Sequence, residues 1–241
     1  MPTGAIDVLF LARNRLEFTR EALETLKEGT DWPLVETLYL YDDQSSDGTR
    51  EYLESMVHTM PVKTIFRSGI FNGPMPVLLD CVAKGTGELI CKVDNDTLMP
   101  PGWLRAGLSV IAEHNDLDLL GIGYRDQLLS KYVGVPPSYE EARFVGGIGI
   151  FRRRVLCALP NLPCRDQSWH GINQSDMKVG WLYPNALVIL LDRIPFQPWV
   201  GHSERYEKLG WQRNWGRYAA NGNRPLWGWW LGQREQRGET S

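Results

Sequence analysis

Apolar residues in the first half of the chain alternate between two spacings. Short continuous apolar runs of strand length are followed by segments in which apolar residues return every three or four positions, as in an amphipathic helix. The expected strands cover residues 6–12, 36–41, 63–67, 88–93 and 117–123. The expected helices cover residues 17–27, 49–58 and 76–84, with a fourth within residues 100–114. This alternation predicts βαβ units in a mostly parallel sheet, with ligands at the carboxyl ends of its strands.

The second half of the chain has a less regular pattern. Polar, proline-containing residues 124–140 predict a loop or short hairpin, and residues 143–159 predict a glycine-rich strand running into a helix. Residues 175–183 predict a short helix, and residues 186–194 a further buried strand. We therefore expect an α/β fold of one domain, residues 1–202, with halves at 1–123 and 124–202, followed by an extension at 203–241.

That extension is rich in tryptophan and arginine and carries seven basic against four acidic residues. Such a segment is suited to stacking on a sugar or nucleobase, covering a bound ligand or touching a membrane surface. Packing of its aromatic side chains onto the domain is an equally simple alternative.

Composition excludes some classes of protein. The chain has 241 residues, of which 43% are hydrophobic and 23% charged, as in an ordinary soluble domain. Its net charge of -3 gives no general attraction to nucleic acid or anionic membranes. No apolar run approaches the roughly 20 residues that span a bilayer, and the start lacks the basic segment of a signal peptide. The four cysteines lack CxxC spacing. We therefore expect a cytoplasmic protein with reduced, mostly buried thiols.

The segment "LYLYDDQSSDGTREYLE", residues 38–54, has two interpretations. Counted from Asp43, its oxygen-bearing residues, glycine and glutamate have the spacing of an EF-hand calcium loop. An EF-hand loop lies between two helices, however, and residues 36–41 have the character of a strand. The pattern favours a turn at a strand's carboxyl end, in which Ser46 or Asp47 caps the next helix.

A second acidic turn follows the expected strand at 88–93. Asp94 and Asp96 lie two residues apart, so their carboxylates would repel each other unless a cation lies between them. Mg²⁺ and Mn²⁺ take a few carboxylate oxygens and complete their coordination with water and phosphate oxygens. Two acidic strand ends in one βαβ series therefore predict a shared site for a divalent cation and a diphosphate.

At this point the sequence resembles a family. "DDQSSDGT" followed by "NGP…LLDCVAKGTGELICKVDNDTLMPPGWL" is similar to the nucleotide-sugar-binding half of GT-A glycosyltransferases, especially the family-2 group. The resemblance runs from about Ile6 to Gly123 and continues through "FVGGIGIFRRRVL", "QSDMKVGWLYPN" and "WVGHS". It implies one GT-A domain, a nucleotide-diphosphate sugar donor that is most often UDP-linked, Mn²⁺ or Mg²⁺, and inverting transfer to a hydroxyl group.

The resemblance also assigns nucleotide-binding residues. Asp43, with Asp42 beside it, would accept a hydrogen bond from the nucleobase, such as the N3–H of uracil, since a carboxylate can only accept. Arg67 would neutralise a phosphate or line the base, although a surface arginine is the simpler alternative. The remaining residues assigned to the nucleotide are Ala12, Arg13, Asn14, Asp94 and Asn95. The sequence "LARN" at residues 11–14 replaces the family's commoner threonine- or proline-containing version.

The metal and catalytic assignments follow in the same way. Asp96 would ligate the cation, Asp94 would reach the ribose or a metal-bound water, and His202 would be a further ligand, which suits Mn²⁺ better than Mg²⁺. Asp176 would be the general base, at a helix start that tolerates a carboxylate. Family members often carry Glu-Asp at that point, and this chain has Ser175 before it. The acceptor region would include Gly146, Gly147, Trp169 and His170.

The acceptor stays open among a glycan, a lipid-linked sugar, a protein and a hydroxymethylated base in DNA, and the acidic net charge disfavours duplex DNA. Two other functions agree less well with the sequence. A sugar-phosphate nucleotidyltransferase normally has a glycine-rich basic loop after its first strand, which "LARNRLEF" lacks. A non-catalytic nucleotide-sugar-binding module is disfavoured by the intact pair Asp94 and Asp96.

Overall fold

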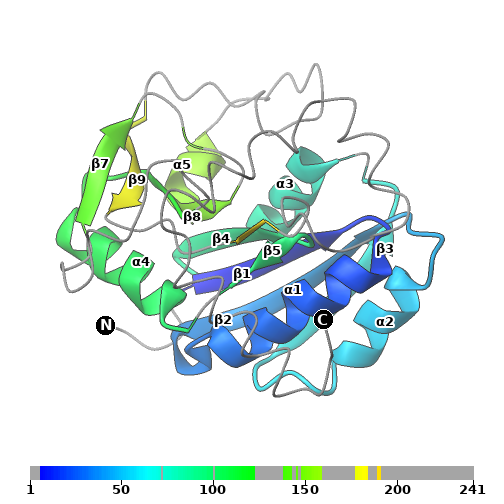
Figure 1. The fold of residues 1–241 in the computed structure, drawn as a ribbon. Coiled ribbons are helices and arrows are strands. Elements are labelled where there is room, and N and C mark those ends of the chain that lie inside the picture. Colours follow the sequence, from blue (N-terminus) through cyan, green and yellow to red (C-terminus); the bar gives the residue numbers. More distant parts are fainter. Residues whose placement is uncertain are drawn as a thin grey trace, which may run out of the picture.

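The computed structural model describes residues 6–71, 73–99, 101–122, 138–142, 145, 148–158, 177–183 and 189–190 (Figure 1). The first half of the described chain alternates strands and helices, as the hydrophobic pattern predicted. The strands are β1 (Ile6–Ala12), β2 (Val35–Asp43), β3 (Thr64–Gly69) and β4 (Leu89–Asp94). The helices are α1 (Leu16–Gly29), α2 (Thr49–Met56) and α3 (Pro74–Lys84), with a 3-10 turn at Trp32–Leu34.

The second half adds shorter elements to the same sheet. These are α4 (Trp103–Glu113), β6 (Leu119–Gly121), β7 (Ser138–Ala142), β8 (Gly149–Arg152), α5 (Arg153–Ala158) and β9 (Val179–Tyr183). The eight-stranded sheet has the order β3-β2-β1-β4-β8-β6-β9-β7. β8 is antiparallel to β4 and β6, and β7 is antiparallel to β9, while the other pairs are parallel. The two-residue strands β5 (Thr97–Leu98) and β10 (Ile189–Leu190) pair separately.

One predicted element was wrong. The expected helix at residues 175–183 is, over its described part, the strand β9, which lies between β6 and β7. Val179 and Leu182 are buried there, and a Cβ on Gly180 would come within 2.3 Å of the Tyr139 ring. Hydrogen bonding to strands on both sides therefore decides the conformation of a segment too short to fix it by local pattern. β7 also supplies a strand where a loop or hairpin was expected.

Helices cover both faces of the sheet. α1, α2 and α4 lie on one face, and α3 and α5 lie on the other (Figure 1). In β1, Val8 and Phe10 pack into the first layer, whereas Leu9 packs into the second. Because a parallel sheet between two helical layers is buried on both sides, its strands are apolar almost throughout. This explains why continuous apolar runs correctly predicted β1, β2 and β4.

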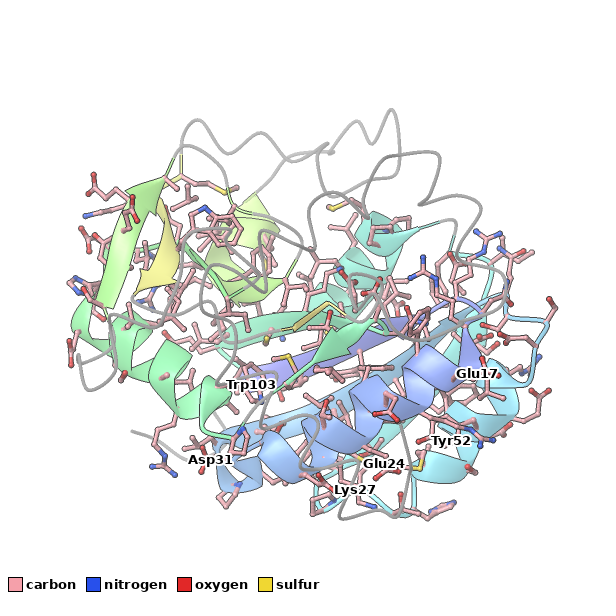
Figure 2. The ribbon with its side chains drawn as sticks, viewed as in Figure 1. Glu17, Glu24, Lys27, Asp31, Tyr52 and Trp103 are labelled. Carbon is pink, nitrogen blue, oxygen red and sulfur yellow. The ribbon has the colours of Figure 1, made fainter. Side chains whose placement is uncertain are left out.

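Polar contacts fix the helices of the first layer to one another. The side chains of Glu24 on α1 and Tyr52 on α2 face each other in Figure 2, and the Tyr52 hydroxyl lies 3.4 Å from Glu24 Oε1. Near the end of α1, the buried Trp103 of α4 donates from Nε1 to Thr30 Oγ1 at 3.1 Å (Figure 2). The first contact joins α2 to α1, and the second holds α4 beside the carboxyl end of α1.

A buried ion pair joins the two halves at the other end of the strands. Asp7 at the start of β1 is fully buried, and its Oδ2 lies 2.5 Å from Arg153 Nη2 at the start of α5. Asp7 also accepts from the backbone N–H of Gly87 at 2.9 Å. Burial raises the pKa of Asp7 above its usual value. The pair therefore depends on Arg153 to offset the burial of a charged carboxylate.

Two further expectations concern cysteines and membranes. Cys81 and Cys91 are buried and Cys157 is exposed, and none of these three is disulfide-bonded. Burial raises the pKa of the Cys81 thiol to about 12, which keeps it unreactive. Among the described helices, none combines the length and apolar character needed to cross a bilayer.

Candidate functional site

The strand order changes direction at the ends of β1 and β4, which is where a ligand is expected. The chain passes from β1 to β2 and β3 on one side, and then returns across β1 to β4 on the other. Ligands of open α/β sheets bind outside the strand carboxyl ends at such a switch point. Ala12 is paired with Asp42 of β2, and Leu11 is paired with Asp94 of β4. The two acidic turns therefore lie at one edge of the sheet, as the sequence predicted.

Asp42 and Asp43 are both buried, but they have different partners. Asp42 accepts from the Ser45 backbone N–H at 3.2 Å and from the Ser68 hydroxyl at 3.0 Å. Asp43 accepts from two backbone N–H groups between β3 and α3, those of Phe71 at 3.0 Å and Gly73 at 2.9 Å. Asp43 therefore ends β2 and also fixes the chain that enters α3. Its position in the sequence did not reveal this second role.

The turn between β1 and α1 connects the two acidic turns. Arg13 Nη1 lies 4.0 Å from Asp43 Oδ2. The Asn14 backbone donates to Ser45 Oγ at 2.7 Å, and the Asn14 carbonyl accepts from Asn95 Nδ2 at 2.9 Å. Residues predicted to bind the nucleotide from three separate strand ends thus form one hydrogen-bonded cluster.

This turn is also conformationally strained. Asn14 and Arg15 have φ values of 54° and 66°, in the left-handed region that residues with a Cβ rarely occupy. Each such residue costs of the order of 1 kcal/mol or more, and strain of this kind concentrates at functional sites. Here the second strained residue, Arg15, directs its guanidinium to Asp96.

Two basic side chains pair with the second acidic turn. Arg15 Nη1 lies 2.8 Å from Asp96 Oδ2, and Lys92 Nζ contacts Asp94 Oδ1. Burial raises the pKa of Asp96, and the nearby charge of Asp94 raises it further, while Arg15 acts in the opposite direction. The sequence prediction missed both cations. Lys92 could have been recognised, because it is the only charged residue inside the apolar run of β4. Arg15 lies one position after Asn14, the last residue of this turn that the sequence assigned to the nucleotide.

The second acidic turn can hold a cation of the expected kind. Asp94 and Asp96 each keep one carboxylate oxygen that accepts no hydrogen bond from the described residues. Among those residues, no group of three or more His, Cys, Asp or Glu side chains could enclose a metal ion. This set fits Mg²⁺ or Mn²⁺ bound by one or two carboxylates and completed by water and phosphate oxygens, and it does not fit a closed protein cage.

Arg67 pairs with an acidic side chain of the protein, whereas the sequence predicted a contact with the nucleotide. Its Nε is 2.8 Å from Asp80 Oδ2 on α3, and the Tyr41 hydroxyl donates to the same oxygen at 2.8 Å. Burial and the hydrogen bond to Asp80 raise the pKa of Tyr41. This cluster packs α3 against β2 and β3. A nucleotide contact by Arg67 remains a prediction.

The other predicted residues lie outside the described part of the chain. They are the base Asp176, the metal ligand His202, and the acceptor-region residues Gly146, Gly147, Trp169 and His170. The extension at residues 203–241 lies outside it too. Their roles remain predictions.

Comparison with known protein families identifies the fold. Residues 7–179, well over half of the chain, match glycosyl transferase family 2. The chain belongs to glycosyl transferase family 2. This confirms the resemblance drawn from the two acidic turns, and it places the chain in a family of sugar-transferring enzymes with the GT-A fold. No curated protein matches the sequence.

Solved structures with the same fold differ widely in sequence. Residues 1–349 of TarS from S. aureus, in complex with UDP-GlcNAc, align with a TM-score of 0.55 at 16% identity, over 90% of this chain and 72% of that one. The mannosyltransferase PcManGT from Pyrobaculum calidifontis, in complex with GDP-Man and Mn²⁺, gives 0.58 at 17%, over 90% and 73%. GalNAc-T7 with UDP, GalNAc and Mn²⁺ gives 0.58 at 12%, over 75% and 42%. The matched region spans 36% of a longer TarS chain.

Proposed function

We propose that this family-2 chain transfers a sugar from a nucleotide-diphosphate donor, with UDP favoured, to an acceptor hydroxyl in a metal-dependent, inverting reaction. One observation carries the proposal. The acidic ends of β2 and β4 flank the end of β1 at the topological switch point, and the turn after β1 contacts both. A cleft edge with two carboxylate clusters suits a diphosphate bound through a cation.

For the donor, Asp42, Asp43, Arg13 and Asn14 would surround the nucleobase and ribose. The support is chemical: Asp43 is buried at the strand end, and a carboxylate selects a base edge that donates, such as uracil N3–H. TarS in complex with UDP-GlcNAc and PcManGT in complex with GDP-Man show that this fold accepts either base. Guanine N1–H donates to a carboxylate as well, so the preference for UDP rests on the family resemblance.

For the cation, Asp94 and Asp96 would supply carboxylate oxygens, and His202 a further ligand. PcManGT and GalNAc-T7 both contain Mn²⁺ in their solved structures, which supports a divalent ion in this family's fold. When bound, the ion stabilises the negative charge that grows on the leaving diphosphate, an effect worth several kcal/mol in comparable enzymes. Lys92 contacts Asp94 from inside the sheet and so holds this carboxylate in place.

For the chemical step, Asp176 would remove the proton from the acceptor hydroxyl as that oxygen attacks the anomeric carbon from the face opposite the diphosphate. Gly146, Gly147, Trp169 and His170 would line the acceptor side. The acceptor is a glycan, a lipid-linked sugar, a protein or, less favoured, a modified base in DNA.

Donor hydrolysis tests the proposal without a known acceptor. Nucleotide sugars are screened for a rise in melting temperature with and without Mn²⁺, because a ligand that binds only the folded state stabilises it. Release of UDP from the best donor is then measured for the wild type, Asp96→Asn and Glu28→Gln. Glu28 is exposed at the far end of α1, so its substitution removes one carboxylate away from the site. We expect loss of turnover in Asp96→Asn alone. Tight donor binding without turnover in the wild type would favour a binding module.

The base is tested separately. Asp176→Asn should reduce kcat for donor hydrolysis by about 100-fold or more while leaving the Kd for the Mn²⁺–UDP pair unchanged, since a general base contributes about 10²–10⁴-fold. An unchanged kcat would remove Asp176 from the mechanism without affecting the donor site.

A further inference from the structure

Each carboxylate of the second acidic turn already has a cationic partner from the protein itself. Lys92 pairs with Asp94, and Arg15 pairs with Asp96. The two positive and two negative charges cancel. A divalent cation that approaches this cluster alone is therefore attracted much less than it would be by two bare carboxylates.

The two cations differ in how easily they can leave. Lys92 is 2% exposed, so moving its ammonium away from Asp94 would leave a buried charge without this partner. Arg15 is 25% exposed and lies in the turn before α1, with the strained φ of 66°. A long arginine side chain near the surface can turn its charge to water without leaving it buried and unpaired. Asp96 can therefore exchange its partner, whereas Asp94 cannot.

The contact geometry supports this exchange. Asp96 holds Arg15 through one oxygen, Oδ2, and its other oxygen accepts no hydrogen bond from the described residues. The side chain of Asp96 is 17% exposed and that of Asp94 is 35% exposed, so both can be reached from solvent. A cation that binds both carboxylates would approach the Arg15 guanidinium within a few ångströms and repel it.

We propose that Arg15 is a built-in counter-cation that competes with the divalent ion for Asp96, so that the site binds the ion tightly only together with the nucleotide diphosphate. The inference rests on the proposed metal-dependent function. The diphosphate reverses the balance because its negative charges attract the ion and provide the displaced guanidinium with a new partner. Arg15 thus sets the order in which metal and donor bind.

Mn²⁺ titrations followed by electron paramagnetic resonance, which detects the free ion, measure this competition directly. They are made on the wild type, Arg15→Gln and Arg20→Gln, with and without saturating UDP. Arg20 is an exposed arginine on α1 whose guanidinium lies over the Tyr52 ring, so its substitution removes one positive charge away from Asp96. Without UDP, Arg15→Gln should bind Mn²⁺ about tenfold tighter than the other two proteins, as expected for removal of one nearby positive charge.

Saturating UDP should bring the wild type close to Arg15→Gln. An Arg15→Gln affinity equal to or weaker than that of the wild type in the absence of UDP would overturn the competition. If the wild type binds Mn²⁺ with UDP in that case, the proposed function stands and only the role of Arg15 falls. If no protein binds Mn²⁺ even with UDP, the metal site and this inference both fail. Should Arg15→Gln not fold, the wild type still tests the competition, because an equal Mn²⁺ affinity with and without UDP would overturn it.

Discussion

The two adjacent aspartates at the end of β2 allow a sharp test of how the site is built. Both are buried, and replacing either with asparagine removes one negative charge with almost no change in volume. They differ in the chemistry of their partners. Asp43 accepts from two backbone N–H groups and from Gln44 Nε2 at 3.4 Å, whereas Asp42 accepts from one backbone N–H and one serine hydroxyl. A backbone N–H can only donate, but a hydroxyl can also accept.

The expected costs follow from these partners. In Asp42→Asn, the amide oxygen can face the Ser45 N–H while the amide nitrogen donates to Ser68, so both hydrogen bonds survive in neutral form at a cost of about 1 kcal/mol. In Asp43→Asn, one of the N–H groups of Phe71 and Gly73 must face an NH₂ group and loses its acceptor. That loss adds about 1–3 kcal/mol, for a total of about 3 kcal/mol.

Thermal and chemical denaturation of the two variants measure the difference. A cost of about 3 kcal/mol should lower the melting temperature by roughly 6–12 °C for a chain of this size, and Asp42→Asn should lower it by only about 2–4 °C. UDP binding is measured on the same variants. Because Asp43→Asn also destabilises the fold, a loss of UDP affinity in this variant is compared with its loss of stability before it is assigned to the nucleobase. If Asp42→Asn destabilises the protein as much as Asp43→Asn does, then partner chemistry does not set the cost and the reasoning is wrong.

Two more predictions concern charges away from the crevice. Arg153→Leu should lower the free energy of unfolding by about 3–5 kcal/mol, since it leaves Asp7 buried without a cation. Adding Asp7→Asn should restore part of that stability. A loss below about 1 kcal/mol for Arg153→Leu in guanidinium denaturation would contradict the role of the pair. Burial works to raise the pKa of Asp47, but hydrogen bonds from Thr49 and the Leu16 backbone bring it below the ordinary 3.8. A lowered pKa stabilises the fold above about pH 4 and ceases to do so as the pH falls. Asp47→Asn should therefore be less stable than the wild type at pH 7, by about 1 kcal/mol or less, and equally stable near pH 2. A difference in stability that persists at about pH 2 would show that ionisation of Asp47 is not its cause.

Local pattern was sufficient for the elements that line the crevice. β1, β2 and β4 are buried on both faces, so their largely apolar runs could be recognised without knowledge of their neighbours. The acidic residues after β2 and β4 were found because parallel strands in βαβ series bring their carboxyl ends to one edge. Both conclusions depend only on the order of elements along the chain.

Pairings across the fold could not be predicted in this way. β9 was mistaken for a helix because its conformation depends on β6 and β7, from segments far away in sequence. Arg15 and Asp96 are 81 residues apart, and only the folded sheet shows which carboxylate the guanidinium reaches. Arg67 was expected at the end of a strand, beside a phosphate or the base, but it lies within β3 and pairs with Asp80 on α3. Specific electrostatic contacts thus depended on three-dimensional neighbours.

The central claim is that the carboxylates after β4 hold a divalent cation that binds the donor diphosphate. Crystals grown with UDP and Mn²⁺, measured for anomalous scattering from manganese, test it most directly. The account predicts a manganese peak about 2.0–2.6 Å from a carboxylate oxygen of Asp96 or Asp94 and bridged to the phosphates, within the range of oxygen ligation distances for hard cations. UDP bound at the crevice without such a peak, or manganese bound elsewhere on the protein, would contradict it.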